Sequence, residues 1–348
     1  MKKVLTAISM SILVLTLFLF PGCGKEGASG AAAAGGIKLF SLLPDNSAGV
    51  VYINFQDLVK MEFFDKMIKE EKPAKPGATF KDYQDFVAKT GIDPRKDVYA
   101  LAIAILGNIG PANTADGVLV AHLNYNKDKI LAILKEQKVG YTEEAYKGIP
   151  VYKFKEVKQD GTEEEIAFAF INESIAAGGK PDGVKKVIDL SKGEGQSIMA
   201  NAKMKPYIEK FNGLVSFVFD FPADAKKVHD LGMAKVDLTK AEVILGDFNY
   251  KDNAYIGEIN LVCPNQEGNN QLVATLNGFK GMAGLAGQEA MDVVNKINIS
   301  ASAEKVTLSF NIPSELLDRV KKKLEEKVKM TAEPAPTPTE TPTETPTE

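Results

Sequence analysis

The feature that most constrains the fold is an alternation of short, β-rich apolar runs with amphipathic segments across residues 37–330. The first runs are VVYINF, YALAIAIL and GVLVAHLNY, all within residues 50–125. Between them lie stretches with helical spacing, such as the one that places Leu58, Met61 and Phe64 on one face. Short strands that alternate with helices of this kind predict an α+β fold built on antiparallel meanders.

The same order of elements occurs a second time in the chain. GLVSFVFDF, AEVILGDFNY and AYIGEINLVC repeat the order of the earlier strands. Gly49 and Gly213 open the corresponding first strands, 164 residues apart, and the offset falls to 140 between Ile166 and Val306. We therefore expect two similar lobes in contact, each an antiparallel meander with amphipathic helices packed on one face. A single continuous sheet shared by both lobes is the alternative. The lobes are residues 37–196 and 197–330.

The N-terminus has the layout of a secretory signal. Lys2 and Lys3 precede an apolar run from Val4 to Phe20, and Pro21 and Gly22 end it. A transmembrane anchor is the alternative, but 17 residues are at the short limit for a hydrocarbon core about 30 Å thick, and no basic cluster follows.

Gly22 and Cys23 extend this layout, and together the segment resembles a bacterial lipoprotein signal peptide. The resemblance implies that residues 1–22 are removed and that Cys23 becomes the acylated N-terminus. More than one acyl chain gives a stable membrane anchor. Gly24, rather than Asp, follows the cysteine, which in that family implies the outer membrane, with the body facing the periplasm or the cell surface.

Two low-complexity segments flank the body. Residues 23–36 form a lipidated Gly/Ala-rich tether, for which a flexible coil predicts a span of roughly 20 Å. Residues 331–348 repeat Pro, Thr and Glu and lack the apolar side chains that a core needs, so we expect a disordered tail. A spacer or a glycosylated arm is the alternative for that tail.

Charge and cysteine content exclude several classes of protein. The chain has 42 Lys and Arg against 46 Asp and Glu, so no basic excess indicates nucleic-acid binding. If Cys23 is acylated, Cys263 has no partner for a disulfide, and its apolar surroundings predict a buried, inert thiol.

The sequence offers no motif for catalysis, for a cofactor or for a metal. His122 lies within an apolar strand and His229 near the end of an expected helix, and both are predicted to be structural. The acidic clusters at 142–144 and 161–165 are predicted to be solvated hairpin tips, and residues 93–97 and 249–253 are predicted to be turns. The glycines between Gly278 and Gly287 follow a helix, which is the wrong context for phosphate binding, so they predict a connection or a mobile loop.

Three stretches carry a second resemblance. They are Leu42–Leu58, the hairpin Gly148–Tyr152, and Ser174–Asp189. In these the body is similar to a family of uncharacterised exported bacterial proteins known only as a domain of unknown function. This resemblance implies a fold and a compartment, and no activity.

We therefore expect a non-enzymatic envelope lipoprotein that binds an envelope protein or another ligand. The alternative is a carrier of a lipid or another hydrophobic ligand, lined by the Met- and Phe-rich helix at 58–68 and the loop at 279–285, where Phe279, Met282 and Leu285 face outward. A carboxylate-based hydrolase is a third and weaker hypothesis, because it has no supporting motif.

Overall fold

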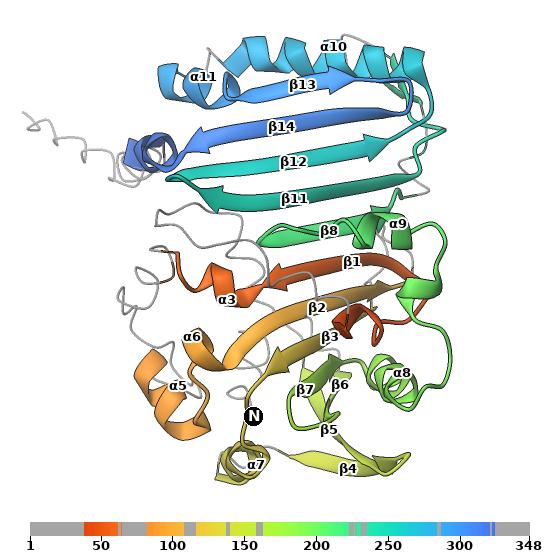
Figure 1. Ribbon diagram of the computed structural model, residues 1–348, viewed down its shortest axis with the longest axis vertical. Coiled ribbons are helices and arrows are strands. Elements are labelled where there is room, and N and C mark those ends of the chain that lie inside the picture. Colours follow the sequence, from red (N-terminus) through yellow and green to blue (C-terminus); the bar gives the residue numbers. More distant parts are fainter. Residues whose placement is uncertain are drawn as a thin grey trace, which may run out of the picture.

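The computed structural model describes residues 38–61, 64, 82–107, 116–136, 140–157, 163–222, 226, 228–230, 235–283, 287–320 and 322–323. The expected signal peptide, tether and C-terminal tail lie outside these residues. The described chain is an α+β structure built on one large antiparallel sheet of twelve strands, with a separate two-stranded ribbon (Figure 1).

The first half of the chain supplies seven strands of the large sheet. Its elements are β1 (Ser47–Asn54), α3 (Phe55–Leu58), α5 (Tyr83–Thr90), α6 (Pro94–Asp97), β2 (Val98–Leu106), β3 (Asp116–Leu123), α7 (Lys127–Glu136), β4 (Tyr141–Tyr146), β5 (Ile149–Val157), β6 (Glu163–Phe170), β7 (Ile175–Gly179) and α8 (Pro181–Ser191).

The second half supplies the other five strands of that sheet and the small ribbon. Its elements are η1 (Ile198–Ala200), α9 (Lys205–Ile208), β8 (Val215–Asp220), β9 (Val228–Asp230), β10 (Lys235–Asp237), β11 (Val243–Lys251), β12 (Ala254–Val262), α10 (Gln266–Met282), α11 (Gln288–Val294), β13 (Ile297–Ala301) and β14 (Lys305–Pro313). Residues 314–320 then form a further helix.

The strand order joins the two expected lobes edge to edge. It is β13-β14-β12-β11-β8-β1-β2-β3-β7-β6-β5-β4, and β1 pairs with β8 in the middle. Figure 1 shows the strands stacked in this order from β13 downward. The halves therefore share one continuous sheet, which was the alternative in the sequence analysis.

A single row of directly opposed residues crosses all twelve strands, and its ten members from β6 to β13 show how the halves are related. At its centre Tyr52 of β1 lies opposite Ser216 of β8. These two residues are 164 apart in the chain, the same offset as Gly49 and Gly213. We call these ten the central row; they are Ala169, Ala177, Val120, Ala102, Tyr52, Ser216, Asp247, Glu258, Ser309 and Asn298.

The two halves repeat the same order outward from this centre. On one side the strands run β1, β2, β3, β7, β6, and on the other β8, β11, β12, β14, β13. The third strand of each half is followed by a helix whose first turn is capped by an asparagine, Asn126 before α7 and Asn265 before α10. A proline marks the start of the last helix of each half: Pro181 is the first residue of α8, and Pro313 directly precedes the helix at 314–320. The hairpin β4–β5 belongs to the first half alone.

Helices cover both faces of the sheet in the first half. On β5, Val151 belongs to the main core with Val184 and Ile188 of α8, whereas its neighbour Tyr152 packs with Leu134 of α7. Successive strand residues point to opposite faces. The expectation of helices on one face is therefore wrong for this half. We name the two surfaces the α8 face and the α7 face.

In the second half α10 packs on the α7 face, whereas the short helix α9 covers the beginning of the α8 face, where Met204 and Ile208 share the main core with Val218. Leu272 and Val273 of α10 contact the cluster that contains Leu261, Cys263 and Val306. Figure 1 shows α10 along the β13 edge of the sheet.

Four local expectations were also wrong. His229 lies in strand β9, opposite Val236, and not in a helix, because β10 supplies a pairing partner. The glycine-rich stretch after Gly278 continues α10 as far as Met282 before any connection begins. Glu144, placed at a hairpin tip, lies within edge strand β4. The segment 94–97, expected as a turn, is the short helix α6, which Asp93 caps.

Candidate functional site

The site residues considered from sequence do not gather at one place. Cys23 lies outside the described residues. Cys263 is fully buried, and this burial raises the pKa of its thiol. His122 lies on the α8 face with its ring 4.7 Å from that of Tyr99, and its pKa is lowered by burial and by the charge of Lys38. Among the described residues no group of three or more His, Cys, Asp or Glu side chains is arranged to hold a metal ion.

The most distinctive surface lies on the α8 face of the second half. There the central row continues as Asp247, Glu258, Ser309 and Asn298 across β11, β12, β14 and β13. The next row is Asn249, Ile256, Asn311 and Lys296. All eight residues line one hollow of about 660 Å³, together with Asn212 and neighbouring backbone. We call this surface the open face.

One side of the open face is held in place by hydrogen bonds. Ser216 donates to Asp247, and the backbone N–H of Leu214 donates to Asn249 Oδ1 at 3.1 Å. Strand β8 and the residue before it therefore hold the two polar side chains of β11, Asp247 and Asn249, in place. Fixed polar groups lose less conformational entropy when a ligand binds.

The other side of the open face carries polar side chains that the described residues leave without partners. The side chains of Asn298, Ser309 and Asn311 have no hydrogen-bond partner in the described part of the chain, and the Lys296 ammonium has no ion pair there. These side chains lie next to one another on β13 and β14. Their donors and acceptors are available to a bound molecule.

The corresponding surface of the first half has the opposite character. In the central row, Ala102, Val120, Ala177 and Ala169 occupy the places of Asp247, Glu258, Ser309 and Asn298. These first-half residues are buried in the main core, together with Val184 and Val187 of α8. The same sheet positions thus hold a covered apolar core in one half and an exposed polar surface in the other.

The two carboxylates of the open face are not arranged like an acid/base pair in an apolar pocket. Asp247 and Glu258 lie directly opposite each other on β11 and β12. However, the Lys305 ammonium is 3.8 Å from Glu258, and Asn260 Nδ2 donates to the same carboxylate at 2.6 Å. The arrangement is suited to hydrogen bonding and to charge balance.

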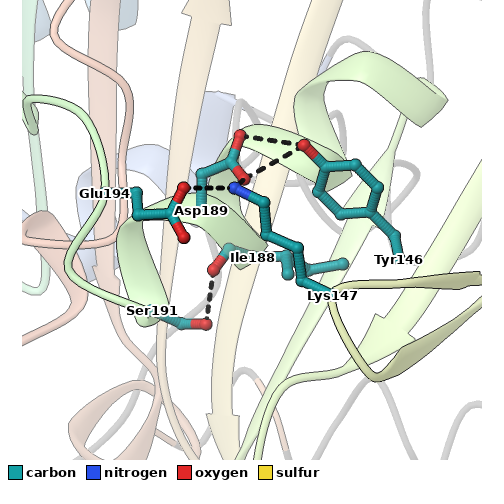
Figure 2. Close-up of polar contacts among 6 residues, drawn as sticks. All are labelled: Tyr146, Lys147, Ile188, Asp189, Ser191 and Glu194. Atoms are coloured by element: carbon teal, nitrogen blue, oxygen red, sulfur yellow. Dashed lines mark hydrogen bonds and ion pairs between the residues drawn. The ribbon is translucent and has the colours of Figure 1, made fainter.

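A second polar cluster ties the extra hairpin of the first half to α8. Figure 2 shows Tyr146 and Lys147 of the β4–β5 turn directed at Asp189 and Glu194. The Tyr146 hydroxyl is 3.1 Å from Asp189 Oδ1, and the carboxylate raises the pKa of that phenol. The polar groups of this cluster bond to one another, so the cluster holds β4 and β5 against α8.

Sequence reasoning missed the open face. The signal that would have revealed it is the alternation of polar and apolar residues in GDFNY, GEIN and LSFN, where every second residue is polar. Residues 249–253 were predicted as a turn, although Asn249 and Tyr250 were also part of a predicted strand. Which polar residues lie together also depends on the strand order, which local patterns do not contain.

No helix in the described portion of the chain is long and apolar enough to cross a membrane.

Comparison with known proteins gives structural likeness alone. No family model matches the chain, and no curated protein matches it. Among solved structures it is similar to crystal form III of TP0453, with 11% identity over 80% of this chain and 95% of that one and a TM-score of 0.47. Crystal form I of TP0453 has 12% identity over 82% and 96% of the two chains and a TM-score of 0.44.

Proposed function

We propose that this chain is an envelope lipoprotein that acts by binding, without catalysing a reaction, and that the open face is its binding surface. The observation that carries the proposal is that the residues of the central row are apolar in the first half and polar in the second. Positions that form a covered core in the first half are polar, exposed and partly unpaired in the second. The hollow of about 660 Å³ lies within the usual range of ligand sites, roughly 300–1,000 Å³.

The proposal includes the domain division of the sequence analysis. Residues 1–22 are a signal peptide, 23–36 a lipidated tether, 37–196 and 197–330 two copies of one α+β unit, and 331–348 a disordered tail. The shared strand order and the paired asparagine caps support the two copies. The anchor places the body on the outer membrane, facing the periplasm or the cell surface.

The anchor is tested by intact mass and by a single substitution. We expect membrane-extracted protein to have the mass of a chain that begins at Cys23 plus diacylglyceryl and acyl groups. Cys23→Ser is expected to abolish lipid labelling and to release the protein from membranes. A variant that stays membrane-bound, with its full-length mass, contradicts the anchor and indicates that residues 4–20 span the membrane.

The binding surface is tested by cross-linking in the envelope. A photoreactive residue at Asn311, on the open face, is expected to give a specific adduct in cells. The same residue at Asn46, an exposed asparagine before β1, serves as the matched control. Equal or absent labelling at both positions contradicts the proposal that the open face binds a ligand.

A carrier of a hydrophobic ligand is the second candidate function. It is favoured by Phe279 and Met282 near the end of α10, whose side chains are 45% and 51% exposed. Leu285 lies outside the described residues. Organic-solvent extraction of purified protein tests this candidate. If the protein is such a carrier, lipid is expected to copurify with the natural chain and to be lost from a Phe279→Ser/Met282→Ser variant.

A further inference from the structure

The ligand of the open face can be classified from its charge, its hydrogen-bonding groups and its shape. We infer that the open face binds a neutral, hydroxyl-rich ligand, a glycan, laid across β11, β12, β14 and β13. This inference rests on the proposed function, because it specifies what the open face binds.

Charge argues for a neutral ligand. The hollow contains two carboxylates, Asp247 and Glu258, and one ammonium, that of Lys296. A second ammonium, that of Lys305, lies 3.8 Å from Glu258 at its border. Positive and negative groups are therefore nearly balanced, whereas sites for polyanions have clusters of Lys and Arg, and sites for metal ions have clusters of acidic ligands.

The hydrogen-bonding groups argue for hydroxyls. Asn298, Asn311 and Ser309 each both donate and accept hydrogen bonds, as does a sugar hydroxyl. Asp247 and Glu258 add acceptors for hydroxyl donors. A ligand whose groups all donate and accept can satisfy both the acceptors and the donors of this mixed surface, so that polar groups covered by the ligand keep hydrogen-bond partners.

The distribution of aromatic residues argues against a protein partner. Cores of protein interfaces are rich in aromatic residues, Met and Arg. On these strands the aromatic side chains alternate onto the α7 face, where Phe248 contacts Phe310 and Tyr250 contacts Tyr255. Within the two rows of the open face, Ile256 is the one apolar side chain. The surface therefore has no large apolar anchor for a protein.

The dimensions fit an extended chain of sugars. Adjacent strands are about 4.8 Å apart, so a row across four strands is about 14 Å long. The two rows of the open face therefore present two parallel lines of mainly polar side chains to a ligand. We expect binding by hydrogen bonds, without a ring stacked on an aromatic platform.

The test is a titration followed by NMR, using the full mature chain with Cys23→Ser. The probes are cellotriose and triacetylchitotriose, both neutral, and a galacturonate trisaccharide, which is acidic. We expect a neutral probe to shift the side-chain amide signals of Asn298, Asn311 and Asn249 saturably, and the acidic probe to bind more weakly. The Asn298→Ala/Asn311→Ala variant is expected to bind at least tenfold more weakly.

Controls separate loss of binding from loss of fold. Asn46→Ala is expected to leave the affinity unchanged, and the backbone spectrum of each variant is checked for native signals. Ser309→Ala provides a milder variant if the double substitution disturbs the sheet. Absence of saturable shifts with both neutral probes, or equal binding of the acidic one, overturns the inference.

The outcome also distinguishes this inference from the proposed function. A protein cross-linked specifically at Asn311, with no response to the sugars, overturns the glycan assignment and keeps the open face as a binding surface. No sugar response together with no specific cross-link overturns both.

Discussion

At the residue scale, Gly257 is a position in the sheet that tolerates little change. It lies on β12 between the rings of Phe248 and Phe310, which are 5.8 Å apart. A Cβ at this position would be 2.4 Å from Phe310 Cζ and 3.0 Å from Phe248 Cδ1. The glycine therefore allows two aromatic side chains to meet over a strand that separates them.

Gly257→Ala is expected to lower the free energy of unfolding by about 1–3 kcal/mol, the usual cost of overpacking. Gly281→Ala is the matched control, because nothing lies within 4 Å of a Cβ there and the position is within α10. We expect that control to raise the free energy of unfolding by up to about 1 kcal/mol, since alanine favours the helix. Urea unfolding measures both. Equal effects of the two substitutions would contradict the role given to Gly257.

The residues of the open face show which features of a site can be predicted from local sequence patterns and which cannot. The strands that carry Asp247 and Glu258 were predicted as short, β-rich runs that repeat the order of the earlier strands, and those strands are present. Their meeting with Ser309 in one row was not predicted, because β14 pairs with β12 across a chain separation that includes α10 and α11. Register over such a distance is set by packing of the whole sheet.

At the element scale, the extra hairpin β4–β5 depends on ion pairs with α8. Glu144 on β4 contacts the ammonium groups of both Lys153 and Lys185, the latter at 2.7 Å. These lysines lower the pKa of Glu144 to about 2. The tip of the hairpin is tied in the same way by Lys147 to Asp189 (Figure 2).

This arrangement predicts acid-dependent opening of the hairpin. A carboxyl whose pKa is lower in the folded state stabilises the fold fully above its unfolded pKa, which is about 4.3, and loses that contribution as the pH falls toward about 2. We expect the amides of β4 to lose protection from hydrogen exchange between pH 4.5 and 2, relative to those of β2. Each measured exchange rate is divided by the intrinsic rate of an unprotected amide at the same pH, so that the comparison reports protection alone.

Glu144→Gln is expected to remove this pH dependence, whereas Glu143→Gln is the neighbouring control. Glu143 has no ion pair among the residues that the structure describes. Unchanged pH dependence in Glu144→Gln would show that other groups control the opening of β4. The prediction of a hairpin tip at 142–144 was wrong because turns and exposed edge strands both accept runs of acidic residues. Such a run therefore does not distinguish the two structures.

At the scale of the whole molecule, the pairing of β1 with β8 makes the two halves one cooperative unit. Tyr52 and Val50 share the main core with Val218 and Val243 across this boundary. We therefore expect a single unfolding transition for the body. The chain has no Trp, so Phe154→Trp and Phe310→Trp variants provide one fluorescent probe in each half.

Coincident denaturation curves from these two probes, with equal midpoints, are the expected result. Two separated midpoints would show that the halves unfold independently, as separate lobes would. The sequence pattern predicted strand content and order within each half, because these follow from local periodicity. It could not distinguish one sheet from two, because the sequences of β1 and β8 are compatible with an edge position and with a central position in a sheet.

The central pairing also has the reciprocity of an isologous interface. Val51 lies opposite Phe217 and Ile53 opposite Val215, and the offset of 164 exchanges these two pairs. A half-length chain ending after α8 would therefore present β1 as an unpaired edge to which a second copy of itself could add, forming a symmetric homodimer. Identical subunits must expose or cover the same surface in both copies. Covalent fusion removes that constraint, so one copy can keep a covered apolar core while the same sheet positions of the other form a polar surface.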